Sequence, residues 1–124
     1  MPIRDMRFED GIFYARQVGL IDDADARTWV DALKTHAAAS PTPIVALIDA
    51  REVEFVSASA SIVFVEGSAT PNVKAAAVVT RSTTTTVKAR TIGMMSEPHH
   101  THETYVFNSL IEAEKFAKAS VRAG

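Results

Sequence analysis

The chain has 124 residues, of which 47% are apolar and 23% charged, a balance typical of one globular domain and not of a disordered or fibrous protein. Thirteen Lys and Arg against fifteen Asp and Glu give a formal charge of −2, which lacks the basic excess of a nucleic-acid-binding protein. Cysteine is absent, which excludes disulfides, thiolate metal sites and a cysteine nucleophile. No apolar run approaches the roughly 20 residues of a membrane span, and the first residues lack a secretory signal. We expect one cytoplasmic domain over residues 1–124.

The first predicted element is a β-hairpin over residues 5–18. Asp10-Gly11 lies between two runs of alternating residues, and Gly accepts the positive φ that tight hairpin turns require. A helix follows, because Asp22 can cap its first amides and apolar residues then repeat at intervals of three and four. The Pro-Thr-Pro of residues 41–43 ends this helix, since Pro cannot donate a helical hydrogen bond.

The middle of the chain alternates between apolar strands and a helix. Residues 44–48 are apolar at every position, which is typical of a strand buried on both faces, and Asp49 ends it. Residues 57–66 have the length of a helix, although their β-branched residues also suit a strand. Residues 73–79 form the next apolar strand.

The last third of the chain predicts a helix, a strand and a second helix. The threonines at 83–86 lower helix propensity, so the first of these helices is expected over residues 87–95. Residues 104–107 form the last strand, and the pattern over 109–112 is a capping box that starts the terminal helix. The order β-β-α-β-α-β-α-β-α predicts an α/β fold. Its mixed central sheet has an N-terminal antiparallel hairpin and parallel later strands, with helices packed on it.

Two segments of the chain resemble the STAS domains, the anti-sigma-factor-antagonist family. Residues 47–60 read Leu-Ile-Asp-Ala-Arg-Glu-Val-Glu-Phe-Val-Ser-Ala-Ser-Ala, similar to the family's buried strand ending in Asp, hydrophobic-aromatic segment and Asp-Ser-Ser-Gly helix start. Residues 106–113 are similar to its final strand, Phe-Asp-Ser linker and Glu-Glu-Ala helix. The likeness is closer still to the STAS-like branch of small bacterial proteins. It implies a regulatory, non-enzymatic module that binds a protein partner or a small ligand.

The phosphoacceptor of the family is replaced in this chain. Ala58 stands at the first Ser of Asp-Ser-Ser-Gly, Ser57 at the Asp and Ala60 at the Gly, while the second Ser is kept as Ser59. The resemblance therefore implies that the phosphorylation switch of the family is lost at position 58. Ser57 and Ser59 stand near a helix N-terminus, where a phosphate is favoured. Both also suit a capping role.

The candidate binding surface lies at the carboxyl ends of the parallel strands, where open α/β sheets bind ligands. An Asp at a strand end and serines at a helix start can also serve the backbone alone, so both interpretations stay open. The candidate residues are Asp49, Arg51, Ser57, Ser59 and Ser61.

Two alternative functions follow from other segments. His99, His100 and His102 lie within four residues, and imidazoles bind divalent metals such as zinc, so a metal-binding protein or enzyme is the first. An exposed polar segment explains the same histidines. Residues 62–65 suggest the second, a carrier of a lipid or another apolar ligand, if they line a cavity. Nucleotide-binding glycine motifs and a base–nucleophile pair are absent from the sequence, so we expect no enzyme and no organic cofactor.

The hairpin also predicts a homodimer. Strand edges must be covered or charged to prevent pairing with another chain, and this hairpin carries Phe8, Ile12, Phe13 and Tyr14 with few charges on its second arm. The sequence therefore predicts a homodimer through the hairpin or the neighbouring helix face. With Phe13 at that interface, Phe13→Lys should favour the monomer.

Overall fold

The structure is a computed structural model that describes residues 2–96 and 102–123, and it confirms the expected order of elements. A five-stranded sheet has the order β1-β2-β3-β4-β5, with β1 antiparallel to β2 and all later neighbours parallel. The elements are β1 (Ile3–Glu9), β2 (Ile12–Ile21), α1 (Asp23–Ala39), β3 (Ile44–Val56), α2 (Ala58–Gly67), β4 (Val73–Val79), α3 (Thr83–Ser96), β5 (Glu103–Phe107) and α4 (Leu110–Arg122).

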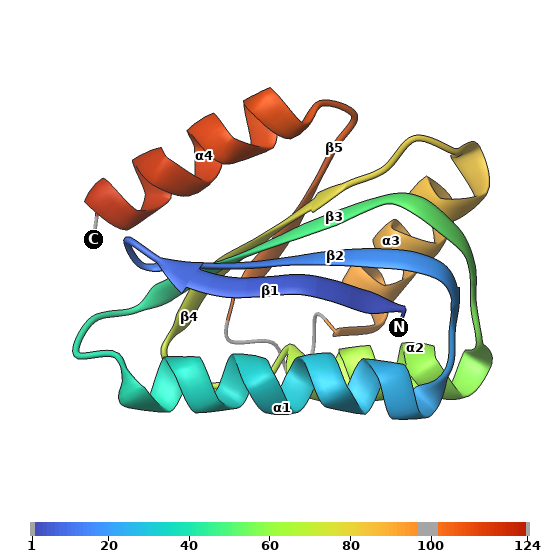
Figure 1. Cartoon of the computed structure of the whole chain (residues 1–124), viewed down its shortest axis with the longest axis horizontal. Helices are drawn as coiled ribbons and strands as arrows, with labels where there is room; N and C mark the ends of the chain where they lie inside the picture. The colour runs from blue at the N-terminus through green and yellow to red at the C-terminus, as the bar shows by residue number, and fades with distance from the viewer. Residues whose placement is uncertain (1, 97–101, 124) are drawn as a thin grey trace.

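The two faces of the sheet are covered unequally (Figure 1). Helices α1, α2 and α3 lie on one face, and α1 packs its buried Val30 and Leu33 there against strand residues such as Phe13 and Ile44. Helix α4 covers the other face, where its Ala113 packs against apolar residues of β3 and β4. None of the described helices has the length and apolar character needed to cross a membrane.

Local signals explain the hairpin and the first helix. Asp10 and Gly11 both have positive φ, at 51° and 81°, as the tight turn requires. The Asp22 carboxylate accepts the backbone N–H of Asp25 at 2.8 Å, while the Asp25 carboxylate accepts the N–H of Asp22 at 3.0 Å. This reciprocal capping box confirms Asp22 as the start of the helix.

Strand β1 is interrupted near its start. Its register against β2 shifts between Arg4 and Arg7, and Asp5 there has a φ of 55°. The Asp5 carboxylate accepts a hydrogen bond from Nε of Arg16 on β2 at 3.1 Å. The bulge is thus held in place by a bond to the neighbouring strand.

Two predicted boundaries differ from the structure by four residues or more. Strand β3 does not end at Asp49 but continues to Val56, because it keeps pairing with β2 through two register shifts. Helix α3 begins at Thr83 and includes the threonines, four residues earlier than expected. The Ser82 hydroxyl caps it by accepting the N–H of Thr85 at 3.0 Å, and Thr86 Oγ1 donates to the Ser82 carbonyl at 2.9 Å. These side-chain bonds offset the poor helix propensity of the threonines.

The contact between α1 and α2 depends on Gly67. A Cβ at this position would lie 2.8 Å from Cγ2 of Val30, which is fully buried. We expect Gly67→Ala to lower the free energy of unfolding by about 1 to 2 kcal/mol, because the two helices must move apart. Urea denaturation measures this change. The matched control is Gly93→Ala in α3, where a Cβ meets nothing closer than Thr104 at 4.0 Å and should cost no stability. Equal losses in both variants would contradict the prediction.

Candidate functional site

Asp49 and Arg51 form a close ion pair on β3. Asp49 is 3% exposed, and side chains alternate along a strand, so it shares a face with Leu47, which packs in the α4 cluster. Its carboxylate accepts hydrogen bonds from Arg51 Nη2 at 2.8 Å, Arg51 Nε at 2.9 Å and the Arg51 backbone N–H at 3.2 Å. The structure therefore brings these two predicted site residues together.

The electrostatics of this pair favour a structural role. Burial alone would raise the pKa of Asp49, but the side-chain and backbone hydrogen bonds from Arg51 outweigh it and hold the pKa below its ordinary value. The same side-chain bond raises the pKa of Arg51. An ionised carboxylate with three donors on it has little capacity left to act as a base or to bind a second cation.

The three candidate serines bond to one another at the start of α2. Ser57 is the N-cap, and its hydroxyl accepts the N–H of Ala60 at 3.0 Å. The Ser59 hydroxyl lies 3.1 Å from the Ser57 hydroxyl, and the Ser61 hydroxyl donates to the Ser57 carbonyl at 3.1 Å. Ser61 is buried, whereas Ser59 and Ala58 are exposed. The capping interpretation is thus confirmed for Ser57.

Two exposed apolar side chains beside this helix start were not predicted. Leu20 on β2 and Phe55 on β3 are partners in the parallel register, and they are 65% and 57% exposed. The next residues, Ile21 and Val56, are buried in the core under α1 and α2, so Leu20 and Phe55 project from the opposite face. The aromatic residue of the STAS-like segment was a partial signal for Phe55. The pairing with Leu20 became visible only with the full length of β3.

Only one of the three histidines of the predicted metal segment lies within the described residues. His99 and His100 lie outside the described residues. His102 is 8% exposed and lines a cavity, so the expectation of an exposed segment is wrong for this residue. In residues 2–96 and 102–123, no group of three His, Asp or Glu side chains could hold a metal ion. The metal site stays a prediction.

A cavity of about 100 Å³ lies between the sheet and the three helices on its α1 face. Of residues 62–65, which were expected to line such a space, Phe64 lines it, while Ile62 is 56% exposed. The lining residues are Gln17, Trp29, Leu33, Ile48, Ala50, Val53, Val56, Phe64, Gly67, Ser68, Ala76, Val78, Thr85, Lys88, Ala89, Ile92, Ser96, His102 and Thr104.

Comparison with known proteins identifies the fold. No protein-family model matches the chain, and no curated protein matches it in sequence. An uncharacterized protein of the DUF3478 family from Shewanella loihica PV-4 matches with a TM-score of 0.65 and 21% identity, over 93% of this chain and 91% of that chain. An anti-sigma factor antagonist from Mycobacterium paratuberculosis matches with a TM-score of 0.63 and 19% identity, over 94% and 91%. The first of these is described as SpoIIAA-like, so the chain has a SpoIIAA-like, that is STAS-like, fold.

Proposed function

We propose that this protein is a regulatory, non-enzymatic module that binds a protein partner. The binding surface, here called the partner surface, consists of Leu20, Phe55, Ala58 and Ser59, at the ends of β2 and β3 and the start of α2. The exposed pair Leu20 and Phe55 carries the proposal. The likeness in fold to an anti-sigma factor antagonist, a protein that acts on other proteins, supports it.

The chemistry of the partner surface suits a protein. Two large apolar side chains, each more than half exposed and paired on neighbouring strands, form the kind of patch that a protein partner covers. Exposed Glu52 and Glu54 on β3 supply charge beside it. The Asp49–Arg51 pair lies on the same strand, and its hydrogen bonds are made within that strand.

Site-specific photo-crosslinking tests the proposal. We expect p-benzoylphenylalanine at position 55 to give a discrete crosslinked protein species in the cells that express this chain. The matched control is the same group at Ile111, which is 66% exposed on α4. A Leu20→Asp change should then remove the crosslink from position 55, because a charge there disrupts the apolar contact. The absence of a species from position 55, or equal species from both positions, would contradict the proposal.

The proposal also predicts the response to a kinase. Ala58 is exposed at the first position of α2, so the site is accessible but has no hydroxyl. Incubation with a serine kinase that acts on STAS antagonists should add no phosphate to the wild-type chain, whereas Ala58→Ser should gain one in intact-mass analysis. One phosphate on the wild type, lost in Ser57→Ala or Ser59→Ala, would restore a phosphorylation switch at those residues instead.

A further inference from the structure

The cavity on the α1 face is separate from the partner surface in its residues and in its chemistry. Its wall is mostly aliphatic and aromatic, from the sheet and from α1, α2 and α3. Among the described residues that line it there is no Asp or Glu, and Lys88 is the sole lysine or arginine. Its volume exceeds several-fold the roughly 10 to 15 Å³ that one water needs on a comparable measure.

One buried polar atom of the cavity wall has no hydrogen-bond partner within the described residues, and a second polar side chain lies in the same wall. Trp29 is 6% exposed, and its indole Nε1 is buried without an acceptor. Gln17 is 5% exposed and also lines the cavity, and its side-chain amide can donate a hydrogen bond. A buried donor left without an acceptor costs about 1 to 3 kcal/mol. An acceptor oxygen brought by a bound molecule would remove that cost.

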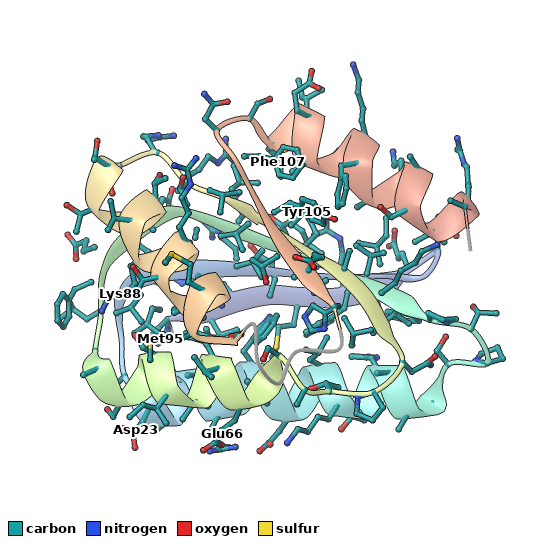
Figure 2. All side chains as sticks on the ribbon, turned by 180° about the vertical axis from the view of Figure 1, so that it is seen from behind. Asp23, Glu66, Lys88, Met95, Tyr105 and Phe107 are labelled. Carbon is teal, nitrogen blue, oxygen red and sulfur yellow. The ribbon has the colours of Figure 1, made fainter. Side chains whose placement is uncertain are left out.

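Lys88 adds a positive charge to these donors. It lines the cavity from α3, is partly exposed, and forms no ion pair with a described residue. Figure 2 labels Lys88 and Met95 on the side of α3 that faces α2. Trp29 and Lys88 can only donate hydrogen bonds, and Gln17 can donate through Nε2. These three groups therefore favour an anionic acceptor, and the aliphatic and aromatic residues of the wall favour an apolar body.

Helix α3 is the wall best able to move. Its buried residues are Thr85 and Ser96, while Val87, Met94 and Met95 are each half or more exposed. Elements with few buried apolar contacts open most readily. We therefore expect a ligand to enter the cavity past α3.

We propose that this cavity binds a small apolar monocarboxylate, such as a medium-chain fatty acid. The hydrocarbon chain lies among apolar residues such as Val53, Phe64 and Ile92. The carboxylate pairs with Lys88 and accepts hydrogen bonds from Gln17. Binding involves no chemical step, so the cavity makes the protein a receptor for this class of molecule.

Octanoate is the probe for this site, and Trp29 is the reporter because it is the one tryptophan of the chain. We expect a saturable change in tryptophan fluorescence and a rise in Tm of several degrees at 100 times the dissociation constant. Octylamine should bind far more weakly, because its ammonium faces Lys88. Phosphatidylcholine vesicles free of fatty acid should leave the fluorescence unchanged. This control distinguishes binding of a free fatty acid from binding of the protein to a membrane surface.

Two substitutions separate the roles of the polar groups. Lys88→Gln should weaken octanoate binding about tenfold and leave octanol binding unchanged, since the charge acts on the carboxylate alone. Gln17→Leu should weaken both ligands. Lys34→Gln, at an exposed position of α1, is the matched control and should change neither. If Gln17→Leu does not fold by circular dichroism, Ala89→Leu, which fills the cavity from α3, replaces it and should abolish both interactions.

The proposal is overturned if millimolar octanoate leaves both Trp29 fluorescence and Tm unchanged. It is also overturned if Lys88→Gln and Lys34→Gln bind octanoate equally, or if octylamine binds as tightly as octanoate. None of these three results bears on the partner surface, because its crosslinking test uses different residues.

Discussion

Replacing Phe13 by Lys is expected to abolish the cooperative unfolding transition rather than to separate a dimer. Phe13 is fully buried on the α1 face, with its ring centroid 6.1 Å from Trp29 and 5.0 Å from His36. Phe13→Ala alone should lower the free energy of unfolding by about 3 to 5 kcal/mol, a large part of the roughly 5 to 15 kcal/mol of a typical domain. A buried ammonium adds a desolvation cost to this loss. Thermal unfolding followed by circular dichroism measures both variants.

The position of Phe13 corrects the sequence-based interpretation of the hairpin. Phe13 was expected at an interface between two copies, and this is wrong because β2 turns it into the core. The homodimer itself stays a prediction, for which Met6 on β1, 42% exposed, is the suitable probe. Met6→Lys should leave the free energy of unfolding within about 0.5 kcal/mol and shift the light-scattering mass toward the monomer. A Phe13→Lys protein with a wild-type transition would contradict the assignment to the core.

The second large effect is expected from Asp49→Asn. The variant loses the charge that holds three hydrogen bonds from Arg51, which should lower the free energy of unfolding at neutral pH by about 2 to 3 kcal/mol. The Arg51 side chain is 34% exposed and regains water in the variant, which limits the loss. Urea denaturation of both proteins at pH 7 measures the difference.

The same pair predicts a pH dependence with a definite sign. Because the pKa of Asp49 in the folded state lies below its ordinary value of 3.8, the carboxylate stabilises the fold above pH 3.8. This stabilisation is lost as the pH falls from 3.8 through the lower pKa of the folded state. Denaturation curves over this range should show the wild type approaching Asp49→Asn. A constant gap between the wild type and Asp49→Asn over this range would contradict the prediction.

Local chemistry made most of the fold predictable. The Asp10-Gly11 turn, the Asp22 cap and the continuous apolar runs of β3 and β4 each act within a few residues, so the sequence shows them directly. The end of β3 depends instead on pairing with residues 18–21 of β2, which are distant in the chain. Polar residues after Asp49 resemble a loop until this pairing is known.

In the candidate site, too, contacts between residues close in the sequence were predictable and contacts between distant elements were not. Asp49 and Arg51 are two residues apart on one strand, and Ser57 caps the helix that follows it, so their contacts could be anticipated. The pair Leu20 and Phe55 comes from two strands. The donors of the cavity come from β2, α1 and α3, and sequence spacing gives no measure of the distance between such elements.

The bulge at Asp5 affects how the protein behaves when it is concentrated. An outer strand with a regular backbone can template a strand of another molecule, which leads to fibrils. In β1 the register shift and the positive φ of Asp5 break that regular spacing, and the bond from Arg16 keeps the break in place. The exposed Arg4 and Arg7 add charge along this outer strand. We therefore expect the hairpin to meet other molecules through its side chains and to resist growth into amyloid.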